Sequence, residues 1–324
     1  MIKMPSYSLR VLKTLFFGKK VSPYLDFSIK GLMKSDEAVS AAQRISVSGV
    51  QEKFPAVIDG GKIRLVREGE RSTHILKPAP WDQTIATRRY IPANEHLTMQ
   101  IAARVYGIRT AANGICVSSD GQLVYITRRF DILPDGTKAE MEDFASICGR
   151  SEQTDGKHFK YSGTYEDIAV GIRKYVSGWM VDMERFFDLI VFNYIYGNGD
   201  DHLKNFSLIR QGEDYRLAPA YDLLNTCLHV QGNDFGLDGG LSLNLFRSDE
   251  YDRTGHPGRT DFEQFAALIG IVPVRSAKIL DRYMTIPEET LSLLRESFLP
   301  EKMQRTYLRI VKERVARFRR YEGV

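Results

Sequence analysis

The feature that most constrains this chain is a strongly apolar helix that runs directly into a loop of charged and polar residues. Over residues 182–196, apolar side chains recur at the spacing of a buried helical stripe, and Gly197 can serve as its C-cap. The loop that follows, residues 197–205, reads GNGDDHLKN. Like charges at Asp200 and Asp201 resist desolvation unless a cation or a donor is present. We therefore expect this loop to face Mg²⁺ or a reacting hydroxyl, although an isolated loop of this composition is more often only a turn.

Composition places the chain among ordinary globular proteins. Its 324 residues are 43% hydrophobic and 27% charged, which fits two units or one two-lobed enzyme with a cleft. The net charge of +4 is too small for a broad nucleic-acid footprint, so any basic surface must be local. No apolar stretch reaches the ~20 residues of a membrane span, and Lys13 interrupts the apolar run near the N-terminus. Because the three widely spaced cysteines suit neither a metal site nor a disulfide framework, we expect a cytoplasmic protein without a secretory signal.

The first part of the chain has the pattern of a small antiparallel sheet that carries one helix. Strands are expected within residues 45–78, where Gly60-Gly61 marks a hairpin turn, and again over residues 123–130. A helix is expected over residues 94–106 from its 3.6-residue apolar period. Residues 1–43 show no pattern that we can assign. We expect a first domain over residues 1–135.

The second part is mainly helical, and we expect a second domain over residues 136–324. One hairpin interrupts the helices, with strands at residues 205–210 and 215–221. Residues 301–324 hold eight Lys or Arg against three Glu. We expect an amphipathic helix with a solvated basic face there, and contact with a partner or with DNA is the alternative.

The spacing of polar residues around this hairpin suggests phosphoryl transfer. Asp200 and Asn205 are five residues apart, as in the kinase catalytic loop, where the Asp accepts the substrate hydroxyl proton and the Asn holds magnesium. The strand after Asn205 runs outward by roughly 20 Å, and its antiparallel partner returns to Asp222. We therefore expect Asp222 beside Asp200 and Asn205, where hard oxygen ligands suit Mg²⁺. A lone Asp after a strand would be only a turn residue.

A phosphate-binding cation is also needed, and Lys77 is the candidate. It ends an expected strand, and Glu95 follows 18 residues later at the start of the next helix. An ion pair between them would orient the amine toward phosphate. Alternatively, Lys77 is a solvated lysine at a strand end and Glu95 a carboxylate that interacts with the helix dipole.

Residues 46–53, SVSGVQEK, precede the first hairpin and fit neither common phosphate-loop pattern. Taken alone, they form a strand end and a turn. In this array they are the candidate for a flap over the nucleotide. Ser46 and Ser48 are candidate phosphoacceptors, because an added charge of about −1.5 to −2 near the phosphates would disorder the flap.

Together these residues resemble the HipA family of bacterial serine/threonine kinases, the toxins of type II toxin–antitoxin modules. The resemblance implies an α+β, bilobal protein-kinase-like fold with a small antiparallel-sheet N-lobe and a mainly helical C-lobe, and ATP and Mg²⁺ as cofactors. The matching motifs are S-x-(S/A)-G-x-Q-x-K at residues 46–53, H-I-(I/L)-K at 74–77, NE at 94–95, G-N-x-D-x-H-x-(K/R)-N-F at 197–206 and L-x-P-x-Y-D at 217–222.

The resemblance also implies a role for each matching residue. The list is Asp200 as catalytic base, Asn205 and Asp222 as magnesium ligands, Lys77 with Glu95 at the phosphates, His202 near the nucleotide, Arg128 and Phe130 in the hinge that receives adenine, Ser48 and Gly49 in the nucleotide loop, and Ser46 and Ser48 as autophosphorylation sites. For His202, structural packing of a loop histidine is the alternative.

Only 43 residues precede Arg44, whereas full-length family members carry a further N-terminal subdomain there. This looks like the split arrangement of the shorter HipT-type members, in which a small HipS-like protein supplies that subdomain. The resemblance further implies a HipB-like DNA-binding antitoxin, DNA contact only through it, and a protein substrate. The family's targets include aminoacyl-tRNA synthetases, but nothing in this sequence selects one.

Two other functions stay open at this point. One is a catalytically silent kinase-fold module that binds an antitoxin or DNA, against which the costly set of polar groups argues. The other is a two-metal phosphoesterase, which would need further His or Asp ligands. The leading hypothesis is an autophosphorylating serine/threonine kinase that acts as a growth-inhibiting toxin.

Overall fold

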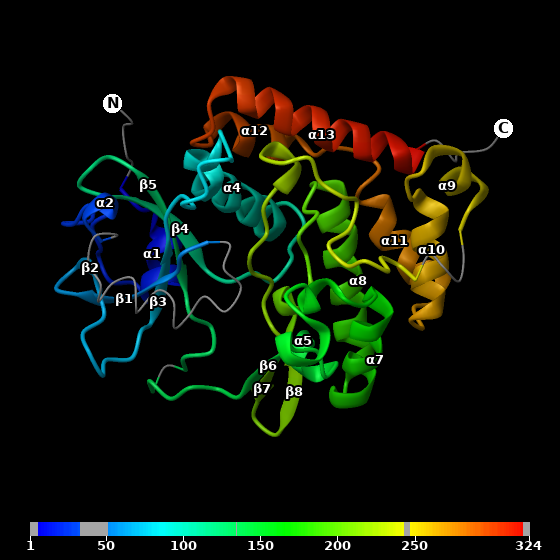
Figure 1. Ribbon diagram of the computed structural model, residues 1–324, viewed down its shortest axis with the longest axis horizontal. Helices are drawn as coiled ribbons and strands as arrows, with labels where there is room; N and C mark the ends of the chain where they lie inside the picture. Colours follow the sequence, from blue (N-terminus) through cyan, green and yellow to red (C-terminus); the bar gives the residue numbers. More distant parts are fainter. Residues whose placement is uncertain (1–5, 33–50, 134, 243–246, 320–324) are drawn as a thin grey trace. The chain divides into compact units, whose positions relative to one another are not determined.

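The computed structural model describes residues 6–32, 51–133, 135–242 and 247–319 (Figure 1). The chain forms two compact units. Unit 1 comprises residues 1–99, 111–137 and 297–299, and unit 2 comprises residues 100–110, 138–296 and 300–324. Helix α4 (Ile91–Arg104) begins in unit 1 and ends in unit 2.

Unit 1 is built on a five-stranded antiparallel sheet in the order β2-β1-β3-β5-β4. Gly60 and Gly61 have φ angles of 54° and 76°, which is the positive pair that a tight two-residue hairpin turn requires. The predicted hairpin and the strand near residue 123 are therefore confirmed, whereas β4 was not predicted. The strands are β1 (Phe54–Asp59), β2 (Lys62–Leu65), β3 (His74–Lys77), β4 (Asn113–Val117) and β5 (Leu123–Arg128).

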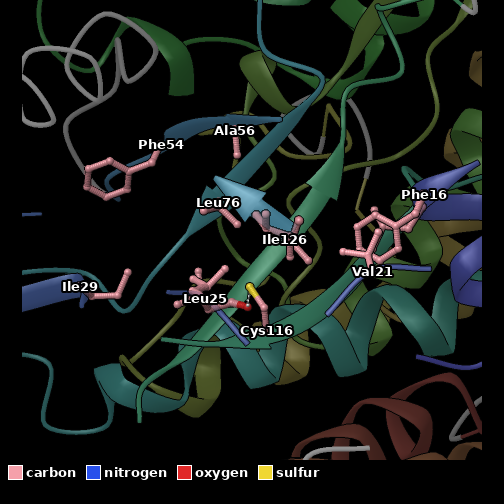
Figure 2. Packing of buried hydrophobic residues seen from close by; sticks show 12 residues of the cluster. Phe16, Val21, Leu25, Ile29, Phe54, Ala56, Leu76, Cys116 and Ile126 are labelled. Carbon is pink, nitrogen blue, oxygen red and sulfur yellow. Dashed lines mark hydrogen bonds between the residues drawn. The ribbon is translucent and has the colours of Figure 1, made fainter. Parts of the chain in front are cut away.

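The N-terminal segment, which sequence patterns left unassigned, packs against one face of this sheet. It contains α1 (Leu9–Phe16) and α2 (Ile29–Leu32). Ser8 caps α1 by accepting a hydrogen bond from the Val11 amide at 3.3 Å. Figure 2 shows apolar side chains from this segment gathered with those of β1, β3, β4 and β5 in one core: Phe16, Val21, Leu25, Ile29, Phe54, Ala56, Leu76, Cys116 and Ile126.

Unit 2 is organised around α8 (Trp179–Ile195), which packs against α7, α11, α13 and β8. The buried stripe is as predicted, and Gly197 follows the helix end with a φ of 71°. The other helices are α5 (Phe144–Ile147), α6 (Glu152–Asp155), α7 (Tyr165–Tyr175), α9 (Asp249–Thr254), α10 (Arg259–Leu268), α11 (Pro273–Asp281), α12 (Glu288–Glu296) and α13 (Glu301–Arg319), with 3₁₀ turns η1 (Arg88–Tyr90), η2 (Phe159–Tyr161), η3 (Leu203–Asn205) and η4 (Thr226–Leu228).

A three-stranded antiparallel sheet, in the order β6-β7-β8, completes unit 2. It consists of β6 (Met141–Asp143), β7 (Ser207–Gln211) and β8 (Asp214–Leu217). The predicted hairpin is confirmed, but both strands are shorter than expected. Gly212 supplies the positive φ of the turn, at 64°.

The C-terminal helix α13 is amphipathic, as predicted. Its apolar side buries Tyr307 and Val311, while Lys302 and Lys312 are exposed on its basic side. Arg314 turns inward instead and donates to the Tyr194 carbonyl oxygen at 2.8 Å. Within the described chain, no helix combines the length and the apolar character that crossing a membrane demands.

Candidate active site

The loop after α8 is held tightly on its inner side. The Gly199 amide donates to the Thr226 Oγ1 at 2.9 Å, and a side chain at Gly199 would meet the Asn233 backbone at 2.5 Å. A Cβ at Gly197 would lie 2.8 Å from the Asn225 amide oxygen. Because Gly197 and Gly199 have no side chain, the loop can pack closely against residues 225–233. This close packing fixes the position of Asp200.

Asp200 is half-buried and its carboxylate is held by a phenol. The Tyr161 hydroxyl donates a hydrogen bond to the Asp200 Oδ1 at 2.8 Å. Burial raises the pKa of the Asp200 carboxyl and the nearby charge of Asp222 raises it further, while the Tyr161 hydrogen bond and the charge of Lys160 act in the opposite direction. Asp200 is thus a carboxylate whose proton affinity is increased, which suits a group that accepts a proton.

Asn205 and Asp222 complete what we call the acidic centre, defined as Asp200, Asn205 and Asp222. The Asn205 Nδ2 donates to the Asp200 carbonyl oxygen at 3.0 Å, which orients its amide. The hairpin returns as expected, because the Tyr221 hydroxyl donates to the Lys204 carbonyl oxygen at 2.8 Å. Asp222 itself has a φ of 58°, in the left-handed region that side chains other than Asn, Asp and Gly rarely adopt. Such a conformation costs about 1 to 3 kcal/mol and persists only where the surrounding structure fixes it, and such residues cluster at functional sites.

The expectation that this loop faces a cation or a hydroxyl does not extend to Asp201, whose carboxylate is held by donors within the fold. Asp201 is buried and accepts hydrogen bonds from the Asn193 Nδ2 and from the Gly236 amide, each at 3.0 Å. Burial raises the pKa of the Asp201 carboxyl to about 7. Because neutral donors satisfy it, Asp201 fastens the loop to α8 and to the segment around Gly236.

In unit 1, Lys77 and Glu95 form the predicted ion pair. The Lys77 Nζ lies 2.7 Å from the Glu95 Oε1, and the two side chains are only 4% and 2% exposed. Lys77 is therefore not a solvated lysine at a strand end. Since α4 begins at Ile91 rather than at Asn94, Glu95 lies in the second helical turn, where interaction with the dipole is weaker.

The structure places the remaining predicted nucleotide contacts as follows. His202 is buried, its ring meets the Tyr161 ring edge-on at 5.2 Å, and its backbone takes part in the η3 turn. The Arg128 guanidinium lies 4.5 Å from the centre of the Phe17 ring, and its amide donates to the Ala112 carbonyl oxygen. Phe130 follows β5 in a turn and is half-buried. Ser46, Ser48 and Gly49 lie outside the described residues.

Two residues of the site, Lys160 and Tyr161, were missed by sequence reasoning. They belong to η2, a single 3₁₀ turn, and Lys160 is buried with its Nζ 4.8 Å from the centre of the Tyr161 ring. A turn of three residues has no hydrophobic period, so the sequence held no signal that could have revealed them.

The donor set of the acidic centre fits a magnesium ion. Across the described ranges, no group of three or more His, Cys, Asp or Glu side chains could hold a metal. The acidic centre instead offers two carboxylates, which repel each other, and one oriented amide. Mg²⁺ usually takes one or two carboxylates and completes its shell with water and substrate phosphates. Asn205 and Asp222 would hold it.

Comparison with known proteins identifies relatives over most of the chain. The family model of the HipA-like C-terminal domain matches residues 45–307. Two proteins of Sinorhizobium fredii named putative kinase, Y4mE and Y4dM, are 31% and 34% identical over 56% and 61% of this chain. A putative kinase of Haemophilus influenzae is 26% identical over 97% of this chain and 92% of its own length. The matches cover 43% and 49% of the Sinorhizobium proteins, so the chain spans about half the length of those relatives.

A solved structure shows the same fold. It belongs to the complex of HipA, HipB and operator DNA from the toxin–antitoxin system of Shewanella oneidensis MR-1. The TM-score is 0.64 at 18% identity, and the match covers 84% of this chain and 65% of that one. The expected α+β, kinase-like fold is therefore confirmed. With the family model matching residues 45–307, these comparisons show that the chain belongs to the family of proteins with a HipA-like C-terminal domain.

Proposed function

We propose that this chain is an ATP- and Mg²⁺-dependent protein serine/threonine kinase that acts as the toxin of a type II toxin–antitoxin module. The acidic centre carries the proposal: a half-buried carboxylate with raised proton affinity lies with an oriented amide and a second carboxylate at the end of a buried helix. The names of the Sinorhizobium and Haemophilus relatives support a kinase.

Each residue of the acidic centre has a separate task in this proposal. Asp200 accepts the proton of the substrate hydroxyl as that oxygen attacks the terminal phosphoryl group. Asn205 and Asp222 hold the magnesium ion. When bound, Mg²⁺ neutralises charge that develops on the phosphates. The Asn205 hydrogen bond to the Asp200 backbone keeps ligand and base in one fixed relation.

In unit 1, Lys77 binds phosphate and Glu95 orients it. A buried ammonium needs a partner, and the 2.7 Å ion pair fixes the direction of the Lys77 side chain. His202, Arg128, Phe130, Ser48 and Gly49 are proposed as further nucleotide contacts on the family resemblance alone.

The test is phosphoryl transfer from labelled ATP by the full chain. Replacing Asp200 by Asn should lower the rate by about 10²- to 10⁴-fold, because the base is lost, while nucleotide affinity stays nearly unchanged. Asp249→Asn is the matched control, since Asp249 is an exposed carboxylate at the start of α9. If Asp200→Asn transfers phosphate as fast as the parent, the assignment of the base is wrong.

Autophosphorylation is proposed at Ser46 or Ser48. Intact mass spectrometry after incubation with Mg-ATP should show additions of about 80 Da, which is one phosphate each. Peptide mapping of the parent and of the Ser46→Ala and Ser48→Ala variants then assigns the position. An undiminished modification in a variant that carries both substitutions would refute both positions.

The partners are proposed from the resemblance and from the HipA–HipB–DNA complex. They are a HipB-like DNA-binding antitoxin, a small HipS-like protein and a protein substrate of the aminoacyl-tRNA synthetase class. Expression of the wild-type chain should arrest growth, and a co-expressed antitoxin should relieve the arrest. Arrest by the Asp200→Asn variant as well would show that inhibition does not depend on phosphoryl transfer.

A further inference from the structure

The contact between Tyr161 and Asp200 points to a residue that no sequence motif marks. The Tyr161 hydroxyl donates to the Asp200 Oδ1 at 2.8 Å. Hydrogen bonds to an ionised carboxylate are about twice as strong as those between neutral groups. Because a carboxylate can turn about its terminal bond, a donor on one oxygen also decides where the other oxygen points.

Tyr161 is itself held from several sides. The Asp238 amide donates to its carbonyl oxygen at 3.0 Å, and its own amide donates to the His158 carbonyl oxygen at 2.9 Å. The His202 ring meets its ring edge-on, with the centroids 5.2 Å apart. A phenol fixed through both backbone and ring can act as a rigid support for a neighbouring group.

The charges around Tyr161 keep it a donor. Burial and the neighbouring Asp200 carboxylate raise its pKa above the ordinary value, so the phenol holds its proton at neutral pH. The buried Lys160 ammonium lies over its ring at 4.8 Å, in the geometry of a cation–π contact. That ammonium also favours the ionised form of Asp200.

We propose that Tyr161 is a positioning residue for Asp200, holding one carboxylate oxygen so that the other is presented to the hydroxyl that receives the phosphoryl group. This inference rests on the proposed kinase function and deepens it. In this role Tyr161 keeps its proton and shares it with Asp200 only as a hydrogen bond. Its contribution is the orientation of the base.

Tyr161→Phe tests the inference, because it removes one oxygen and keeps the ring against His202. A base displaced by about 1 Å can cost up to about 10²-fold in rate. We therefore expect kcat for transfer to fall by about 10- to 100-fold, while the Kd for Mg-ATP changes less than about twofold and the melting temperature stays within a few degrees. A residue with a merely structural role would change stability and affinity together with the rate.

Tyr165→Phe is the matched control. Tyr165 is also buried beside the loop, but its hydroxyl donates to the Asp201 carbonyl oxygen, at 3.3 Å, and not to the Asp200 carboxylate. Its kcat should stay within about threefold of the parent. An equal loss of kcat in both variants would show that general loosening of the loop is responsible, and would overturn the positioning role.

Different results would contradict the positioning role of Tyr161 and the kinase proposal. An active wild-type chain with an equally active Tyr161→Phe variant overturns the positioning role and leaves the kinase proposal intact. A wild-type chain that binds Mg-ATP but transfers no phosphate contradicts the kinase proposal, and the positioning role falls with it.

Discussion

The two polar centres of this chain differ in the signs of their charges: one is a buried ion pair, and the other contains two like charges. In unit 1, the Lys77 ammonium and the Glu95 carboxylate lie 2.7 Å apart and cancel each other. In unit 2, burial raises the pKa of Asp200 and the like charge of Asp222 adds to this rise, while the Tyr161 hydrogen bond and the charge of Lys160 lower it. An ion pair fixes geometry, whereas two like charges near each other favour binding of a cation.

The largest expected effect comes from breaking the compensated pair. Lys77→Met leaves the Glu95 carboxylate buried without its cation, and this should lower the free energy of unfolding by about 3 to 5 kcal/mol. Urea unfolding of both chains measures it. Lys62→Met is the control, because Lys62 pairs with Asp26 where both side chains are mostly exposed, and the change should be below about 1 kcal/mol. Equal small losses would contradict the burial of the Lys77–Glu95 pair.

Removing both charged side chains tests whether Lys77 and Glu95 compensate each other. The double variant Lys77→Met, Glu95→Leu leaves no buried charge at the site of this pair, so it should recover at least about 2 kcal/mol relative to Lys77→Met alone. The same unfolding experiment supplies the double-mutant cycle. Additive losses would mean that the two charges do not compensate each other.

The next largest expected effect is a dependence of folding stability on pH that is caused by Asp201. Its pKa is raised to about 7 in the folded chain, so between about pH 4 and pH 7 the folded state binds a proton that the unfolded state has lost. Stability from this group is present at low pH and is lost as pH rises toward 7, by up to about 1.4 kcal/mol per pH unit. Asp201→Asn should remove that slope in unfolding curves recorded from pH 4.5 to 7.5. An unchanged slope would place the titrating proton elsewhere.

The smallest effect should have the opposite sign. Asp222→Asn removes the repulsion with Asp200, and Asn tolerates the left-handed backbone of this position. Without Mg²⁺, the variant should be more stable than the parent by about 0.5 to 1 kcal/mol. Thermal unfolding in EDTA measures this difference. A clear loss of stability would mean that the other contacts of Asp222 outweigh its repulsion with Asp200, and that its role is structural.

The sequence revealed the elements whose chemistry follows local rules. The Gly60-Gly61 hairpin, the buried stripe of α8 and the spacing from Asp200 to Asn205 all depend on short-range geometry, and the structure contains each of them. Boundaries were less accurate where side chains break the pattern. Helix α8 starts at Trp179, three residues before the expected start at Asp182. Its first turn exposes the apolar Met180 and Val181, so the buried apolar period does not extend into that turn.

What could not be predicted depends on contacts between distant segments. Helix α1 acquires its place only from the sheet that covers its apolar side. Asp200 and Asp201 are adjacent and identical in type, but Asn193 and the Gly236 amide donate hydrogen bonds to the Asp201 carboxylate and hold it inside the fold. Tyr161 reaches Asp200 across 39 residues of sequence, and no periodic pattern encodes such a contact.

The affinity of the full chain for an ATP analogue that cannot be hydrolysed, measured by calorimetry with Mg²⁺ and in EDTA, tests the acidic centre most directly. We predict that the wild-type chain binds at least about tenfold more tightly with Mg²⁺, and that Asp222→Asn loses this gain. Equal affinity of the wild-type chain in both buffers would contradict the account.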